Sequence, residues 1–168
     1  LFALLLRISY AFFLQILLYK SIHKSKVYYL YYKNCFTMSE LRKNTIEFLS
    51  ILDGYHQICK GLHWGAVKHA EHILTDEIDD SVLEYQDKIA EIVMGMIISD
   101  NGEKFKVGEL KSLTSNAKDC MSMLKEMEGD VIEYKGQIGD EARMQAIHNV
   151  LDDMLSDINK WKYLSTFA

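Results

Sequence analysis

The sequence predicts an all-α fold, built as a bundle of four long helices. Its 168 residues contain no proline, the residue that most strongly interrupts helices. From Met38 onward, apolar residues recur mainly at spacings of three, four and seven, which places them on one face of a helix. A hydrophobic content of 49% and a charged content of 26% are typical of a soluble domain with a single core.

Residues 1–37 form a separate hydrophobic segment that contains basic residues but no Asp or Glu. We consider three interpretations: a segment outside the working protein, a membrane anchor, and a signal peptide. Arg7 and Gln15 interrupt the apolar run that an anchor requires, and the basic start of a signal peptide is missing. We expect the folded domain to comprise residues 38–168, without residues 1–37. The basic residues of the segment are Arg7, Lys20, Lys24, Lys26 and Lys33.

The first two helices are expected at about 39–64 and 68–98. Ser39 is a candidate N-cap for the first helix, and Gly65 marks its end. The second helix ends at the polar stretch SDNGEKFKVG, whose NG pair is a strong turn signal. The expected core residues are Leu41, Ile46, Leu49, Leu52, Cys59 and Leu62 in the first helix, and Ile73, Leu74, Ile78, Val82, Ile89, Val93 and Ile97 in the second.

The third and fourth helices are expected at about 109–129 and 139–165. Asp140 and Glu141 would favour the start of the fourth helix, because carboxylates stabilise a helix N-terminus. The connection of roughly ten residues before the third helix is long enough for a crossover, and crossover bundles include the ferritin-like folds. The expected core residues are Leu110, Leu113, Ala117, Met121, Leu124 and Met127, then Ile147, Val150, Leu151, Met154, Ile158 and Trp161.

Charge and cysteine content restrict the function further. All 24 acidic residues follow Met38, together with 14 of the 19 basic ones, so this part of the chain disfavours nucleic acid and favours cations as partners. The three cysteines, Cys35, Cys59 and Cys120, show no metal-knuckle spacing and are odd in number. We therefore expect a cytoplasmic protein without a zinc ribbon or a disulfide framework.

The second helix carries a stripe of possible metal ligands. At about 100° per residue, His72, Asp76, Asp87 and Glu91 fall on one narrow face, and Asp80 lies close to it. A histidine four residues before a carboxylate is a ligand pair suited to iron, zinc or manganese. The alternative interpretation of the stripe is an ordinary solvated helix face.

One metal ion cannot contact both ends of this stripe. Asp76 and Asp87 are eleven residues apart, which is about 16 Å along a helix. If two copies of the helix pack antiparallel about a two-fold axis near residues 81 and 82, then His72 and Asp76 of one copy face Asp87 and Glu91 of the other. This arrangement predicts two identical sites between subunits.

The stretch HWGAVKHAEHILTDEIDDSVLEYQDKIAE resembles the ferroxidase segment of Dps-like ferritins, the DNA-binding proteins from starved cells. In that family an HW pair precedes a helix with H-x3-D, an aspartate eleven residues later, and D-x3-E. This sequence has His63 and Trp64, and then the four residues of the stripe. The resemblance implies five iron ligands, His63, His72, Asp76, Asp87 and Glu91, with the first three from one subunit and the last two from its partner.

The resemblance also implies a ferritin-like four-helix bundle that assembles into a hollow dodecamer. It would oxidise iron(II), preferably with hydrogen peroxide, store the ferric product, and so protect against oxidative damage. The link after the HW pair is about three residues shorter than in the family, so His69 or His56 could take the place of His63. The acidic body has no lysine-rich tail, and we do not expect DNA binding.

A different class of function is a structural or interaction protein. It would be a catalytically inactive ferritin-like bundle or an adaptor tethered to a membrane through residues 1–37. A di-metal oxidase within one bundle is disfavoured because it requires E-x-x-H pairs, which the sequence lacks. Trp64 and Asp80 are expected to be a packing residue and an exposed acid.

Overall fold

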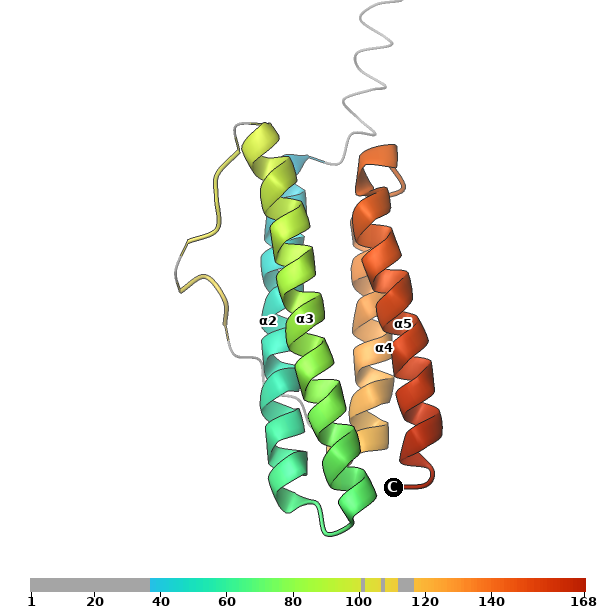
Figure 1. The fold of residues 1–168 in the computed structure, drawn as a ribbon. Coiled ribbons are helices and arrows are strands. Elements are labelled where there is room, and N and C mark those ends of the chain that lie inside the picture. Colours follow the sequence, from blue (N-terminus) through green and yellow to red (C-terminus); the bar gives the residue numbers. More distant parts are fainter. Residues whose placement is uncertain (1–36, 101, 107, 112–116) are drawn as a thin grey trace, which may run out of the picture. The chain divides into compact units, whose positions relative to one another are not determined.

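The first two helices of the folded part form an antiparallel pair. In the computed structural model, which describes residues 37–100, 102–106, 108–111 and 117–168, α2 spans Met38–Gly65 and α3 spans His69–Ser99 (Figure 1). Both helices lie within about a residue of their predicted positions. The predicted N-cap, Ser39, is wrong by two residues, because Thr37 accepts the hydrogen bond from the Glu40 N–H and the Glu40 carboxylate accepts from the Thr37 N–H.

The second pair of helices differs from the prediction at its start. Helix α4 spans Cys120–Gln137 instead of about 109–129, and α5 spans Gln145–Ser165 after a short 3-10 helix, Ala142–Met144. Asp119 sets the start of α4, since its carboxylate accepts from the Ser122 N–H at 2.7 Å. Gly139 has a φ of 69°, a left-handed conformation that suits glycine and separates α4 from α5.

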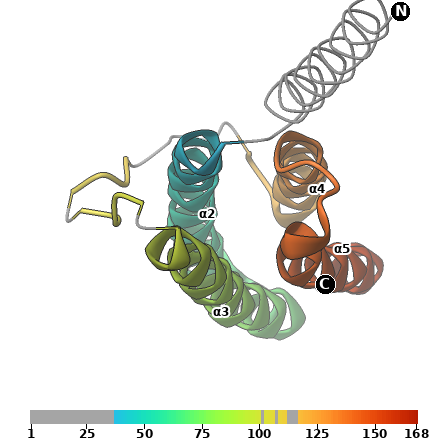
Figure 2. The same cartoon turned by 90° about the horizontal axis from the view of Figure 1, so that it is seen from above.

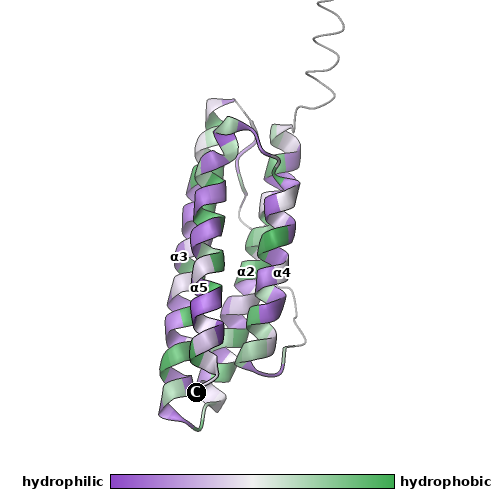
Figure 3. Cartoon of the chain, turned by 90° about the vertical axis from the view of Figure 1, so that its right-hand side faces the viewer, coloured by the Kyte–Doolittle hydropathy of each residue, from purple (hydrophilic) through white to green (hydrophobic). Residues whose placement is uncertain are grey.

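All described elements are helical, and within the described residues there is no strand, which confirms the all-α prediction. Each helix carries hydrophobic and hydrophilic residues side by side, as Figure 3 shows. Most expected core residues are buried, but Ile73 and Leu110 are 53% and 47% exposed. Leu113 lies outside the described residues. The largest fully buried side chains are Trp161, Tyr134, Phe48, Leu41, Leu52, Ile78, Ile89, Ile97, Met123, Leu124, Met127 and Ile138.

The contacts between helices fix their directions. Along α2, Thr45 meets Tyr134 of α4 and Cys59 meets Met123, so residue numbers rise on one helix and fall on the other. Helix α2 is therefore antiparallel to α4 as well as to α3, and α3 and α4 run in the same direction. The chain between them has to travel back along the bundle.

Described parts of this connection lie on the outer side of α2 and α3 (Figure 2). Arg42 of α2 pairs with Glu109 at 2.6 Å, and the Lys111 N–H donates to the Ser50 hydroxyl at 3.0 Å. The connection thus follows α2 from its first turns toward its middle.

The described residues belong to one compact unit, Phe36–Ala168. None of the helices in this part of the chain is long and apolar enough to cross a membrane. The proposed anchor or signal segment at residues 1–37 lies, except for Thr37, outside the described residues.

Candidate functional site

The turn between α2 and α3 brings three of the five predicted ligands together. The rings of His63 and His72 meet edge to face, with 3.8 Å between their centroids. His63 Nδ1 lies 3.7 Å from Asp76 Oδ1. His72 and Asp76 are neighbours because they are one helical turn apart on α3, and the turn at residues 66–68 returns the chain beside His63.

A hydrogen bond determines which nitrogen of His63 carries a proton. His63 Nδ1 lies 3.2 Å from the carbonyl oxygen of His72, and a carbonyl can only accept. The Nδ1–H therefore donates, and the neutral ring keeps its lone pair on Nε2. A histidine that donates one N–H to a backbone carbonyl while its other nitrogen stays available is typical of a metal ligand.

The other two predicted ligands lie further along the same helix. Asp87 and Glu91 are exposed on α3, about 16 Å and more along the helix from Asp76. Among the residues that the structure describes, no three His, Cys, Asp or Glu side chains of one chain gather closely enough to hold a metal ion. His63, His72 and Asp76 are therefore neighbours in one chain, but they do not form a metal site by themselves.

The outer face of α3 is more apolar than a solvated helix face usually is. Ile73, Leu83 and Ile98 are exposed there, and by helical geometry they fall within about 60° of the line through Asp80. Asp80 itself is exposed, as predicted. Large apolar side chains among carboxylates are typical of a surface that contacts another protein.

Sequence reasoning missed a buried carboxylate next to this stripe. Asp79 is only 4% exposed, and its two oxygens lie 2.6 Å from His56 Nδ1 and 3.0 Å from Lys60 Nζ. The pattern of apolar residues contained a signal, since Asp79 lies three residues before the buried Val82, which is the spacing of one helix face. Because His56 is bound to Asp79, the structure gives no support for His56 as a replacement for His63 in the site.

The Asp79 hydrogen bond raises the pKa of the Lys60 ammonium, and the charges of Asp76 and Asp80 act in the same direction. A fixed positive charge therefore lies beside the carboxylates at the start of α3. His69, the other possible replacement, is exposed in the first turn of α3. Trp64 is 78% exposed, so the expectation that it packs beside the site is wrong for a single chain.

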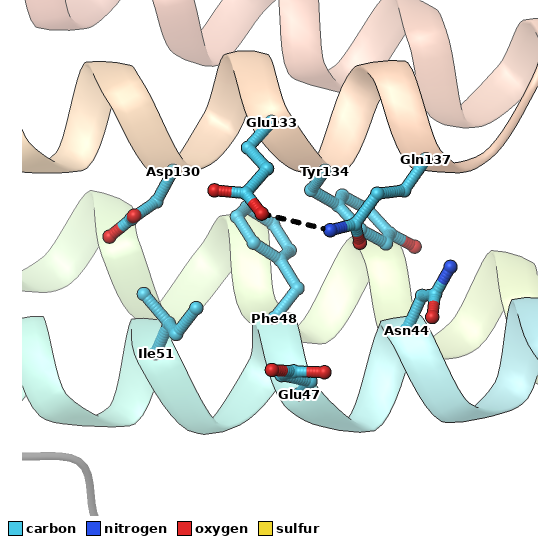
Figure 4. Close-up of a pocket in the computed structure, with 8 residues that line it drawn as sticks. All are labelled: Asn44, Glu47, Phe48, Ile51, Asp130, Glu133, Tyr134 and Gln137. Carbon is cyan, nitrogen blue, oxygen red and sulfur yellow. Dashed lines mark hydrogen bonds between the residues drawn. The ribbon is translucent and has the colours of Figure 1, made fainter.

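A second hollow lies between α2 and α4. This pocket of about 140 Å³ is shown in Figure 4, with acidic side chains around the stacked rings of Phe48 and Tyr134. Two of its carboxylates already have protein partners, since Asp130 accepts from Tyr55 and Glu133 accepts from Gln137. Its size and these hydrogen bonds make it a weaker candidate than the end of the bundle that holds His63.

Comparison with protein-family models, with curated proteins and with solved structures found no match.

Proposed function

We propose that this chain is an iron(II) ferroxidase of the Dps-like, ferritin-like type, with its sites between two copies of α3. The observation that carries the proposal is the position of its donors on one helix. His72 and Asp76, beside His63, lie at one end of an exposed stripe, and Asp87 and Glu91 lie about three turns further on the same stripe. The proposed bundle is ferritin-like, with a crossover between α3 and α4.

An antiparallel pair of α3 helices would complete two sites. With the two-fold axis between Ser81 and Val82, Asp76 of one copy faces Asp87 of the other, and His72 faces Glu91. The same symmetry sets the exposed Leu83 close to the axis, where it would be covered. The apolar residues on this face then have a reason to be there.

The donor types suit iron that has to be oxidised and then released. Imidazole nitrogen and carboxylate oxygen bind iron(II), and the hard oxygen donors stabilise iron(III) without the trapping that thiolates would cause. In the proposed reaction each hydrogen peroxide molecule accepts one electron from each of two iron(II) ions, takes up two protons and leaves as two water molecules. The acidic chain would attract iron(II) to the interior of a shell, for which a cytoplasmic dodecamer is the expected form.

The direct test is peroxide-dependent oxidation of iron(II) by the full chain. We expect the double variant Asp87→Asn, Glu91→Gln to fall to the protein-free rate, because two of the three carboxylates of each site are lost. The matched control is Glu84→Gln, an exposed acid of the same helix that pairs with Lys88. If the parent chain is no faster than the protein-free reaction, the proposal fails and α3 is a structural surface.

Complementation tests the division of the site between chains. A variant with His72→Ala and Asp76→Ala lacks one half of each site, and the Asp87→Asn, Glu91→Gln variant lacks the other. Random pairing on co-expression yields mixed dimers with one intact site, so we expect about a quarter of the parent rate from two inactive variants. Absence of recovery with mixed dimers present would contradict a site shared between two chains.

A further inference from the structure

A preformed apolar pocket lies beside the proposed site, under the segment that follows α3. The guanidinium of Arg42 fixes this segment in place, because it donates to the carbonyls of Glu103 and Lys104 at 2.8 and 3.0 Å and to both carboxylate oxygens of Glu109. The Lys106 N–H also donates to that carboxylate at 2.6 Å. The wall of the pocket is therefore hydrogen-bonded to α2.

The pocket has a volume of about 370 Å³ and opens beside Asp87. Its polar lining residues are Gln86, Asp87, Lys106 and Glu109, of which Gln86 is already bound to the Leu49 carbonyl at 2.9 Å and Glu109 to Arg42. Apolar side chains from three parts of the chain make up most of the rest, which suits an apolar occupant. These side chains are Ile46 and Leu49 of α2, Ala90 of α3, and Phe105 and Leu110 of the connection.

The opposite end of the bundle carries apolar side chains that are exposed among the described residues. Around the turn between α2 and α3, Trp64 is 78% exposed, Val67 95% and Ile73 53%. An exposed tryptophan next to two exposed aliphatic residues is typical of a protein contact site, because tryptophan contributes strongly to such contacts.

The two-fold pairing of the proposed function brings these two surfaces together. The axis that sets Asp76 against Asp87 also sets Ile73 of one copy against Ala90 of the other, at the edge of the pocket. The pocket wall reaches further in the same direction, since the Phe105 N–H lies 3.5 Å from the sulfur of Met94. Trp64 lies in the last turn of α2, so it is at the same end of the α2–α3 pair as Ile73.

We propose that the pocket is the docking site for the α2–α3 turn of a second copy, with Trp64 as the side chain that enters it. This inference rests on the proposed function for the register of the two chains. Two-fold symmetry makes the contact reciprocal, so that each chain gives one Trp64 and receives one. The contact would link the His63 end of one chain to the Asp87 end of its partner and hold the two halves of each site together.

Fluorescence of Trp64 tests the docking without iron. The chain has two tryptophans, and Trp161 is fully buried, so a full chain with Trp161→Phe reports Trp64 alone. We expect acrylamide quenching of Trp64 to fall several-fold as the protein concentration rises through the dimer transition. If Trp161→Phe folds poorly, the contribution of Trp64 can be obtained in another way. It is the fluorescence of the parent chain minus that of Trp64→Phe, measured at the same protein concentrations.

A pocket variant and a matched control locate the contact. Leu110→Asp places a charge in the pocket wall at a half-exposed position, and we expect it to weaken dimerisation at least about tenfold and to leave Trp64 open to acrylamide. Ile132→Asp makes the same change on α4, where Ile132 is 57% exposed, and should leave both quantities unchanged. Equal effects of the two variants would overturn the proposal.

Cross-linking separates this inference from the proposed function. Leu83→Cys, in a Cys35→Ser background, sets one thiol of each copy near the axis, and Cys59 and Cys120 are buried. If the Leu83→Cys dimer forms a disulfide and iron oxidation persists, but Trp64 stays as accessible in the dimer as in the monomer, the docking is wrong and the proposed function stands. The docking proposal is also overturned if residues 1–35 already bury Trp64 in the monomer. Failure of both cross-link and oxidation overturns both.

Discussion

Asp79 of α3 lies with one carboxylate oxygen 2.6 Å from His56 Nδ1 of α2, and the pair is almost closed to solvent on the Asp79 side. Lys60 binds the other oxygen. The three side chains join α2 to α3 two turns before the chain reaches His63. This contact holds the two helices in register where the first half of the proposed site is built.

We expect Asp79→Ala to lower the free energy of unfolding by about 2 kcal/mol, because it removes two charge-assisted hydrogen bonds from a buried position. The partially exposed His56 and Lys60 can turn toward water, which keeps the loss moderate. Urea unfolding measures the change. Asp80→Ala, its exposed neighbour, is the control and should differ from the parent by less than about 0.5 kcal/mol.

Two buried tyrosines connect the helix pairs. The Tyr55 hydroxyl donates to Asp130 at 2.6 Å and the Tyr85 hydroxyl donates to Asp157 at 2.7 Å. Each Phe substitution should cost about 1 to 1.5 kcal/mol in urea unfolding, and the double variant should show the sum, because the two sites share no partner. Tyr163→Phe, at an exposed position, should have no effect. A double variant no less stable than either single one would contradict this view.

Alkaline pH should destabilise the fold. Burial raises the pKa of the Cys120 thiol to about 11 and of the Tyr134 hydroxyl to about 12. From the ordinary thiol pKa near 9 upward, the unfolded chain releases these protons and the folded chain keeps them. Stability that is present below pH 9 is therefore lost as pH rises, by up to about 1.4 kcal/mol per pH unit and group.

Urea midpoints measured from pH 8 to 11 check this dependence. Cys120→Ala removes one of the groups, so its stability should fall less steeply with pH than that of the parent. Identical slopes would show that the Cys120 thiol ionises alike in both states.

Arg42 should protect the segment after α3 from proteolysis. Its hydrogen bonds to Glu103, Lys104 and Glu109 hold backbone next to trypsin sites. We expect Arg42→Gln to increase tryptic cleavage after Lys104 and Lys106 about tenfold, since local opening then no longer breaks these bonds. Lys43→Gln, the exposed neighbour, is the control. An unchanged rate would mean that other contacts hold the segment.

The proposed ligands predict a difference between two histidines in the same helix. His72→Ala should weaken anaerobic iron(II) binding by at least about tenfold, because it removes a donor, and His69→Ala should leave binding close to the parent value. Titration of iron(II) into the full chain measures both. The opposite ranking would place His69 in the site and change the ligand set.

The sequence was sufficient for much of the fold, because α2 and α3 have long apolar stripes and clear ends. It misplaced α4 because Leu110 has helical spacing relative to later residues, yet residues 109–111 are not helical and the Lys111 N–H donates to Ser50 of α2. Asp119 starts α4 by accepting a hydrogen bond from the Ser122 N–H. This local N-cap signal is present in the sequence, but the prediction gave more weight to the apolar pattern.

For the candidate site, spacing placed His72 and Asp76 on one face, and the structure adds that His63 reaches them. Spacing alone could not find Asp79 as a buried partner of His56, because that contact depends on how α2 packs against α3. The exposure of Trp64 likewise depends on the path of the turn after it.

Helix α3 runs without a break for 31 residues, and this continuity fixes the distance between residues at its two ends. The separation of Asp76 from Asp87 is set by the rise of the helix alone, with no loop that could absorb an error. One residue inserted between them would turn one end relative to the other by about 100° and lengthen the helix by about 1.5 Å. In a symmetric pair of chains the same insertion occurs twice, so length changes that a surface loop would tolerate would misalign both sites at once.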